Sequence, residues 1–407
     1  MRLSLKTRQD ILRKKAMEYK RASKKQKGKI LAEVIELTEY NRKYAITILN
    51  GYCRVVHTEI DGTRVTMKAH KPKHKRKRKK IYDTDVFMVL RKLWCIFDCI
   101  CGKRLVYMIR AMLVSLILKK EIECTEIVKA KLFTISASQA DRMLAPERKA
   151  MQIRGMSHTR PHSMLKYQIP IRRNGEWYSK AEPGYLAMDL VGHEGGNARG
   201  DFAFTLNMTD IATGWTEPCA IKNKAQKWTF EAIKHIRGRL PFKVVGLHSD
   251  SGSEFINAIL YRYCKSEHIQ FTRSRPNRKN DNAHVEQKNN MVVRRFVGYH
   301  RYDTDDEVAL MNLLYERLRL YVNFFMPSAK LKSKERIGSR IVKKYEPYRT
   351  PYERLLDLDI LSGKDKAILE KTKKNLNPAK LMREISRLQE QLMRIQNQKV
   401  RAVKRAG

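Results

Sequence analysis

Residues 185–191 read Y-L-A-M-D-L-V, an apolar run that a single acid interrupts. The length and apolar composition of the run are typical of a strand buried in a sheet. A charge inside such a strand is costly unless it is paired or bound to a metal ion. Asp189 is flanked by Met188 and Leu190 and has no adjacent base. It is therefore a candidate functional residue, with a structural salt bridge as the alternative.

The segments around this run predict a mixed sheet with helices on its faces. Further strands are expected at 202–208, 215–221, 242–247 and 269–273, with helices at 228–240, at 256–267 and around Glu286. The order is therefore β-β-β-α-β-α-β-α. Three consecutive strands followed by alternating helices and strands imply a sheet with both antiparallel and parallel pairs.

Two further acids stand where the same sheet is expected to bring them close to Asp189. Asp250 ends the strand F-K-V-V-G-L-H-S-D, and Glu286 lies in R-P-N-R-K-N-D-N-A-H-V-E-Q-K-N, where a polar loop turns into a helix. Ligands of open α/β sheets gather beyond the carboxyl ends of the strands. We therefore expect Asp189 and Asp250 to converge, and Glu286 to reach the same point from a helix beside that edge.

Three converging carboxylates with few cations nearby repel one another, and divalent cations remove this repulsion. Mg²⁺ prefers carboxylate oxygens and keeps water for a substrate phosphate. Two such ions roughly 3.5–4 Å apart activate the attacking oxygen and stabilise the leaving oxygen. Thirty-five residues separate Asp250 from Glu286. This interval alone is a weak signal, and the contexts of the three acids make it specific.

On three stretches the sequence resembles the DDE transposases and integrases that have a catalytic core of the retroviral-integrase type. These stretches are Y-L-A-M-D-L-V-G-H, H-S-D-S-G-S-E-F and N-D-N-A-H-V-E-Q-K-N. The flanking V-V-R-R-F-V-G-Y-H-R-Y-D and N-F-F-M-P-S-A-K-L are similar to bacterial insertion-sequence transposases of this kind. The resemblance implies an RNase H-like, mixed-sheet catalytic core over residues 181–302.

The resemblance also implies a reaction and its cofactor. Such enzymes nick the ends of a mobile element and join the new 3′ ends to target DNA with two Mg²⁺ or Mn²⁺ ions. Carried over, Asp189 would bridge both ions, while Asp250 and Glu286 would each complete one. No His-His-Cys-Cys zinc module precedes the core. This departs from retroviral integrases and fits a bacterial element.

The charge balance of the chain independently indicates a polyanionic partner. The sequence has 85 Lys and Arg against 42 Asp and Glu, a net charge of +43, while 42% hydrophobic residues suffice for real cores. Phosphate neutralisation with counterion release rewards such a surface. We expect double-stranded DNA, both element ends and target, as partner, and a homo-oligomer on that DNA. An anionic membrane surface or a ribosome is the alternative.

The N-terminal part is expected to read DNA. Residues 1–52 predict three short helices with a basic last helix, which suits a helix-turn-helix domain, although a plain helical bundle has the same pattern. Residues 53–81 are expected to form a basic linker arm. The arm lies on DNA or serves as a solvated tether. Its candidate DNA contacts are Lys75, Arg76, Lys77 and Arg78.

Residues 82–150 predict a second helical domain of the helix-turn-helix type. Ser136 with Gln139 three residues later makes a capping box for a short helix that Pro146 is expected to end. Residues 303–407 predict a basic helical C-terminal region. Its last helix has Asn377 as cap and a short coiled-coil-like seam, which either dimerises the protein or docks on its own body.

Three cations close to Glu286 are candidate phosphate contacts, with a solvated basic face as the alternative: Lys288, Arg294 and Arg295. The first ten residues are polar and basic, and the most apolar stretch, 93–118, is interrupted by charges, so neither a secretory signal nor a membrane span is expected. Seven scattered Cys residues favour a reducing compartment. We therefore expect a bacterial cytoplasmic, nucleoid-associated protein.

The sequence leaves three functional hypotheses. The first is a DNA transposase that binds element ends, nicks them and joins their 3′ ends to target DNA. The second is a structure-selective nuclease of the same fold. The third is a domesticated, catalytically inactive DNA-binding regulator, and the presence of all three carboxylates argues against it.

Overall fold

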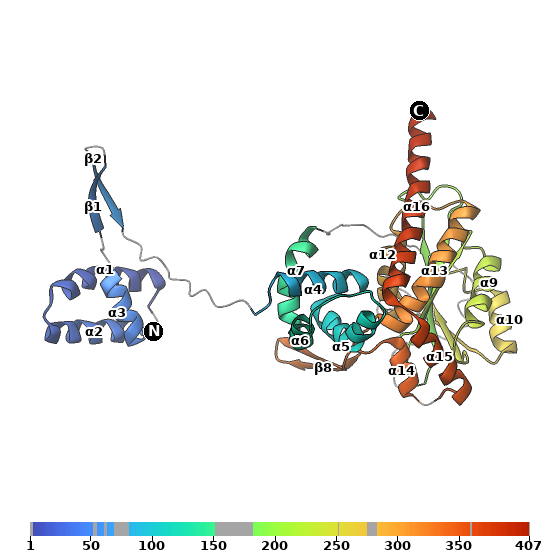
Figure 1. Cartoon of the computed structure of the whole chain (residues 1–407), viewed down its shortest axis with the longest axis horizontal. Helices are drawn as coiled ribbons and strands as arrows, with labels where there is room; N and C mark the ends of the chain where they lie inside the picture. The colour runs from blue at the N-terminus through green and yellow to red at the C-terminus, as the bar shows by residue number, and fades with distance from the viewer. Residues whose placement is uncertain are drawn as a thin grey trace. The chain divides into compact units, whose positions relative to one another are not determined.

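The chain divides into two compact units, Met1–Lys80 and Ile81–Gly407 (Figure 1). The structure, a computed structural model, describes residues 3–51, 55–60, 63–68, 81–150, 182–250, 252–274, 283–358 and 360–406. None of the helices in these ranges combines the length and apolarity that crossing a bilayer requires.

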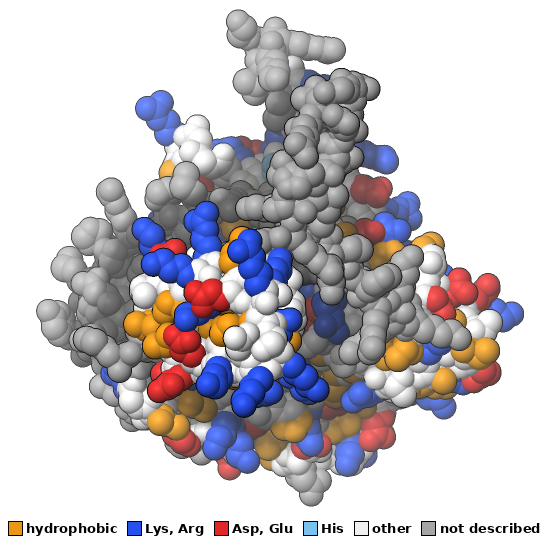
Figure 2. Space-filling view, turned by 90° about the vertical axis from the view of Figure 1, so that its left-hand side faces the viewer, with side chains coloured by type: hydrophobic (Ala, Val, Ile, Leu, Met, Phe, Trp, Pro, Cys, Tyr) orange, Lys and Arg blue, Asp and Glu red, His pale blue; other side chains and the backbone are white. Residues whose placement is uncertain are grey.

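The N-terminal unit contains the three expected helices and a hairpin. Its elements are α1 (Leu5–Arg21), α2 (Lys24–Thr38), α3 (Arg42–Gly51), β1 (Val55–Ile60) and β2 (Thr63–Lys68). Ser23 caps α2 with a reciprocal Gln26 bond, because the first N–H groups of a helix lack partners within it. Lys and Arg side chains are prominent on the face of the molecule in Figure 2. A helix-turn-helix reading of these helices stays a prediction.

The antiparallel hairpin β1–β2 falls within the segment expected to be a basic linker arm, 53–81. Its sequence signal was present, since β-branched runs flank Asp61-Gly62, a pair that favours two-residue hairpin turns. The Lys and Arg run at 75–78 lies outside the described residues.

A five-stranded mixed sheet forms the centre of the second unit. Its strands are β3 (Tyr185–Gly192), β4 (Phe204–Asp210), β5 (Thr216–Ile221), β6 (Gly246–Ser249) and β7 (Gln270–Arg273). They lie in the order β5-β4-β3-β6-β7. The β3–β4 and β4–β5 pairs are antiparallel, and the β3–β6 and β6–β7 pairs are parallel. The predicted mixed α/β sheet is confirmed, and its strand order is consistent with an RNase H-like core.

Helices cover both faces of the sheet. Helices α9 (Gln226–Arg237) and α10 (Ala258–Ser266) pack on one face, where Leu186 and Met188 of β3 are fully buried among their side chains. Side chains along a strand alternate between faces, so Tyr185, Ala187 and Asp189 belong to the opposite face. That second face faces α11 (Ala283–Lys288), whose Val285 is buried against Tyr185 and Ala187.

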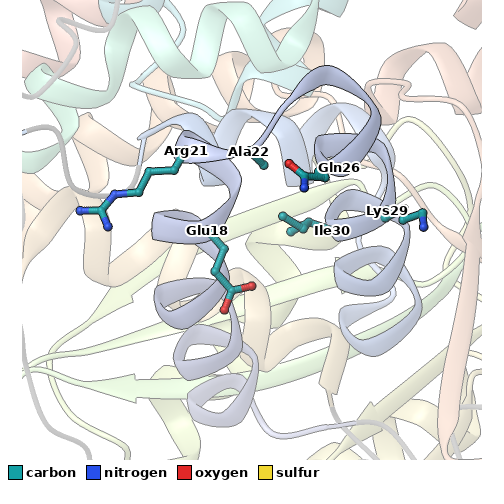
Figure 3. A pocket seen from close by; sticks show the side chains of 6 residues that line it. All are labelled: Glu18, Arg21, Ala22, Gln26, Lys29 and Ile30. Atoms are coloured by element: carbon teal, nitrogen blue, oxygen red, sulfur yellow. The ribbon is translucent and has the colours of Figure 1, made fainter.

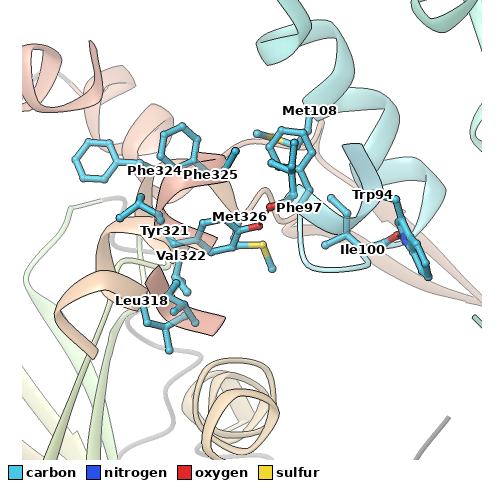
Figure 4. Packing of buried hydrophobic residues seen from close by; sticks show 14 of the residues in the cluster. Trp94, Phe97, Ile100, Met108, Leu318, Tyr321, Val322, Phe324, Phe325 and Met326 are labelled. Atoms are coloured by element: carbon cyan, nitrogen blue, oxygen red, sulfur yellow. Dashed lines mark hydrogen bonds between the residues drawn. The ribbon is translucent and has the colours of Figure 1, made fainter. Parts of the chain in front are cut away.

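The expected second helical domain, 82–150, shares its core with the rest of this unit. Its helices are α4 (Thr84–Ile96), α5 (Gly102–Leu118), α6 (Glu126–Thr134) and α7 (Ala137–Ala150). Figure 4 shows Trp94, Phe97 and Ile100 beside side chains of α13 (Asp305–Phe325). These residues belong to one hydrophobic cluster that also includes parts of the C-terminal region.

One detail of α7 corrects the sequence prediction. Ser136 Oγ accepts a bond from the Gln139 N–H at 3.2 Å, which is one of the two bonds of the predicted capping box, while the Gln139 side-chain oxygen accepts from Arg142. Pro146 does not end the helix, which continues to Ala150. Proline removes only one intrahelical hydrogen bond, and tertiary packing of Leu144 at 0% exposure holds the helix in place.

The C-terminal region combines helices with a second hairpin. Its remaining elements are the π-helix η3 (Asn289–Arg294), α12 (Arg295–Val297), β8 (Leu331–Ile337), β9 (Arg340–Tyr345), α14 (Pro351–Asp357), α15 (Gly363–Asn375) and α16 (Pro378–Ala406). Asn377 caps α16 by accepting bonds from two backbone N–H groups. The seam residues Leu381, Ile385 and Leu392 are buried in the core cluster, so the predicted seam docks on the protein's own body.

Tyr321 joins the helical region to the core, because its hydroxyl donates to the carbonyl of Ile96 at 2.7 Å in a fully buried position. Tyr321→Phe leaves that carbonyl without its partner. We expect it to lower the free energy of unfolding by about 1–2 kcal/mol. Chemical denaturation measures this, with Tyr345→Phe at an exposed position as control, expected within about 0.5 kcal/mol of wild type. Equal effects of both variants would contradict the role of this bond.

Candidate functional site

Asp189 lies on the face of the sheet that is covered by α11. Its Oδ2 accepts a hydrogen bond from the side-chain amide of Asn289 at 2.7 Å, and its Oδ1 accepts from the backbone N–H of Leu190 at 2.9 Å. The Asn289 oxygen in turn accepts from Asn207 at 2.8 Å. Asn207 pairs directly with Asp189 across β3 and β4. The Asn289 side chain therefore links the end of α11 to β3 and β4 at the position of Asp189.

Asp250 directly follows β6, the strand that pairs with β3. The parallel pairing of β3 with β6 sets Leu186 against Leu247 and Ala187 against His248. Continued by two residues, the same register places Asp189 opposite Asp250, on strands that run about 4.8 Å apart. By the alternation of side chains, both acids belong to the face that α11 covers. The convergence of Asp189 and Asp250 stays a prediction, which this register supports.

The carboxyl of Asp250 is largely withdrawn from water. Burial raises its pKa, and the backbone N–H of Gly252, which donates to Oδ1 at 3.0 Å, opposes this shift. Among the described residues, Asp250 has no Lys or Arg as an ion-pair partner. A half-buried carboxylate without a cationic partner is a suitable place for an external positive charge.

Glu286 lies within α11, next to the buried Val285 and one helical turn before Asn289. Since Val285 contacts β3 and Asn289 bonds Asp189, the backbone on either side of Glu286 is held against the sheet. Its side chain is outside the described part of the structure. The helix that carries Glu286 is therefore located at the expected face, while the role of its carboxylate stays a prediction.

The oxygens of Asp189 and Asp250 suit a hard divalent cation, because Mg²⁺ prefers carboxylate ligands. No group of three His, Cys, Asp or Glu side chains at metal-binding distance occurs among the described residues, which exclude the Glu286 carboxyl. The described part of the site thus supplies two of the three expected ligands, Asp189 and Asp250.

Glu254 is a further acid at this site that the sequence analysis did not single out. Burial is the main cause that raises the pKa of Glu254, and the nearby charge of Asp250 raises it further. The signal was present in H-S-D-S-G-S-E-F, where Glu254 follows Asp250 by four residues. It lies in a compact turn in which the Phe255 and Ile256 N–H groups donate to the Gly252 carbonyl.

The cations predicted to contact DNA near Glu286 have protein partners in part. Arg295 forms an ion pair with Asp98 at 2.6 Å, which gives its guanidinium a structural role at the α4–α5 junction. The guanidinium of Arg294 lies 4.8 Å from the ring centroid of Tyr299. Burial lowers the pKa of Lys288 to about 7, so less of its charge is available to a phosphate at neutral pH.

Two histidines near the acids in sequence have ordinary hydrogen-bonding roles. His193 Nε2 bonds Thr205 at 2.7 Å, and burial lowers the pKa of this histidine to about 3. The ring nitrogens of His248 bond the hydroxyls of Thr272 and Ser274. Both rings therefore form hydrogen bonds within the fold.

An open hollow at the α1–α2 junction is separate from this site, because it belongs to the N-terminal unit. Figure 3 shows Arg21 and Lys29 pointing away from each other at its rim. Its lining comprises Glu18, Arg21, Ala22, Gln26, Lys29 and Ile30. The lining has one acid, Glu18, two cations and apolar side chains, and this combination does not resemble a catalytic site.

The chain is 35% identical to a protein of Sinorhizobium fredii described as "Uncharacterized protein y4rM", over 355 residues that make up 87% of this chain and 96% of that protein. No family model matches the chain. Among solved structures, the catalytic core domain of BIV integrase matches with a TM-score of 0.28 and 18% identity, over 43% of this chain and 95% of that chain. The strand order β5-β4-β3-β6-β7 is consistent with an RNase H-like core.

Asp250→Asn removes a buried charge, so we expect it to raise the free energy of unfolding at pH 7.5 in EDTA. Because the pKa of Asp250 is raised in the folded state, its protonated carboxyl favours folding at low pH. This contribution is lost as the pH rises from the usual pKa of an aspartate through the raised pKa of Asp250. The advantage of Asp250→Asn over wild type should therefore be larger at pH 7.5 than at pH 4.

Metal binding gives the same variant a second readout. Mg²⁺ at ten times its dissociation constant should stabilise the wild type by about 1.4 kcal/mol and stabilise Asp250→Asn much less. Thermal unfolding with and without Mg²⁺ measures this, and Asp201→Asn, at an exposed acid, is the matched control. An undiminished Mg²⁺ response in Asp250→Asn would remove Asp250 from the ligand set.

Proposed function

We propose that this chain, which belongs to the same family as the Sinorhizobium fredii protein y4rM, is a DNA transposase of the DDE type. In this proposal it binds the ends of a mobile element, nicks them and joins the 3′ ends to target DNA. It would act in the bacterial cytoplasm on nucleoid DNA, as a homo-oligomer assembled on its substrate.

The observation that carries the proposal is the register between β3 and β6. Extended by two residues, this register supports an arrangement with Asp189 and Asp250 on neighbouring strands, on the face where α11, which contains Glu286, packs. Two acids on neighbouring strands repel each other, and no Lys or Arg among the described residues forms an ion pair with Asp250. Such an arrangement is retained where a cation and a phosphate are to be bound.

In the proposed mechanism, Asp189, Asp250 and Glu286 hold two Mg²⁺ or Mn²⁺ ions. When bound, the two ions lower the barrier to in-line attack at a DNA phosphate. Asn289 positions the centre, because its amide fixes the Asp189 carboxylate and holds the end of α11 against the sheet.

DNA recognition is assigned in this proposal to the N-terminal parts of the chain. Helices α1–α3 would act as a helix-turn-helix domain, residues 75–78 as a basic arm and residues 82–150 as a second DNA-reading module. The net charge of +43 supports DNA binding, because Lys and Arg side chains gain free energy when they contact the phosphates of a duplex.

The test is cleavage and joining of a duplex that ends in the terminal repeats flanking the coding sequence. Asp189→Asn, Asp250→Asn and Glu286→Gln are each expected to reduce nicking by about 100-fold or more, while DNA binding stays close to wild type. Asp201→Asn, an exposed acid outside the site, should retain full activity.

Three results would contradict parts of this proposal. Nicking by Glu286→Gln at the wild-type rate would remove Glu286 from the site. Nicking of branched DNA without strand joining would favour a structure-selective nuclease. Sequence-specific binding with no nicking by the wild-type protein in Mg²⁺ or Mn²⁺ would favour an inactive regulator.

A further inference from the structure

The hairpin of β8 and β9, residues 331–345, is a strongly basic ribbon that lies open to solvent. It contains six Lys and Arg residues and one acid, Glu335. Every side chain on its two strands is exposed except that of Ser333, which is partly buried. A two-stranded ribbon with both faces in water is only marginally stable by itself, so this one is expected to gain support from a partner.

Cations gather on one face of the ribbon. Lys334 stands directly opposite Lys343, and Arg336, two residues along the strand, belongs to the same face. Like charges directly opposite each other destabilise a strand pair. The second face is more balanced, because Glu335 accompanies Arg340 and Lys344 there. We call the set Lys334, Arg336 and Lys343 the cationic face.

The base of the ribbon is anchored firmly in the core. Ser328 and Arg349 exchange two backbone hydrogen bonds that close the base. The buried guanidinium of Arg354 donates to the Ser328 hydroxyl at 2.9 Å, and the ammonium of Lys330 donates to the Ile211 carbonyl at 3.0 Å. A mobile loop would not need this attachment, which holds the exposed strands in a defined direction.

We propose that the ribbon grips duplex DNA through its cationic face. DNA phosphates would neutralise Lys334 and Lys343, which face each other and have no acidic partner among the described residues. A two-stranded ribbon also has a width that the major groove of DNA admits. The inference rests on the proposed function only in taking DNA as the substrate. It adds a DNA-contacting surface within the C-terminal region, apart from the N-terminal reading modules.

The base of the ribbon lies away from the acids of the candidate active site. The N–H of Ile211 bonds the carbonyl of Tyr185, the first residue of β3, and Asp189 follows about 13 Å further along the strand. The ribbon therefore contacts DNA away from the phosphate that is attacked. Its loss weakens DNA binding and raises KM, and the nicking rate at saturating DNA stays unchanged.

The test compares two double variants that each remove two cations from the same ribbon. K334Q/K343Q alters the cationic face, and R340Q/K344Q alters the other face. Binding of a fluorescent random-sequence duplex is measured in EDTA between about 50 and 200 mM salt. K334Q/K343Q should reduce the slope of log K against log salt by about 1.8, because each lost phosphate contact contributes about 0.9. R340Q/K344Q should change that slope by less than half as much.

Folding does not confound this comparison. Neutralising Lys334 and Lys343 removes a repulsion, so the melting temperature of K334Q/K343Q without DNA should equal or exceed that of wild type. A second arm uses a duplex that carries the terminal repeat. A loss on both duplexes identifies a general grip, and a loss on one alone assigns the ribbon to element ends or to target DNA.

Three outcomes would overturn the proposal. The first is an equal change in the salt-dependence slope for the two double variants, and the second is unchanged DNA binding by K334Q/K343Q. The third is a change in the sedimentation of K334Q/K343Q without DNA, which would indicate that the ribbon contacts a second copy of the chain. Binding needs no active carboxylates. The grip can thus fail while Asp250→Asn still abolishes nicking, and it can hold in a protein that does not nick.

Discussion

The second unit depends on the hydrogen bonding of β3 on both of its edges. On one edge β3 pairs antiparallel with β4, and on the other it pairs parallel with β6. The change of strand direction at β3 brings the middle of one strand beside the end of another that is far away in sequence. We expect Asp189 and Asp250 to be neighbours for this reason, and α11, the helix that contains Glu286, packs on the same face. A slip of one residue in this register would turn Asp250 to the opposite face.

Helix α13 connects this sheet to the rest of the unit. It packs against β5 and α16, and Tyr321 bonds the end of α4 across a fully buried interface. The helices expected to form a separate DNA-reading domain therefore share one core with the five-stranded sheet. This arrangement couples the position of residues 84–150 to that of the acids, which a flexible tether would not do.

The excess positive charge is divided between two uses. Some cations have structural partners, as Arg295 has Asp98 and Arg319 has the buried Glu217. Others lie on exposed elements, above all the ribbon of β8 and β9, where Lys334 faces Lys343. Pairs of like charge on an exposed strand pair have no structural benefit, so their use lies in what they bind.

Much of the core could be predicted from the sequence, because its signals are local. Alternation and apolar runs predicted the order of strands and helices, and Asn377 and Ser136 were recognised as caps from their immediate neighbours. Local signals were also misread. Pro146 lies inside α7 because one missing hydrogen bond is outweighed by packing, and the turn pair Asp61-Gly62 was passed over within a basic segment.

The sequence by itself determined the chemistry that is available: an acid within one strand, an acid at the end of another, a glutamate opening a helix, and a large excess of cations. Only the tertiary structure decided which of these groups meet. The register of β3 with β6, the Asn289 bond to Asp189, and the docking of the α16 seam on α13 join residues far apart in the chain. Such contacts depend on the packing of whole faces, and no short stretch of sequence records them.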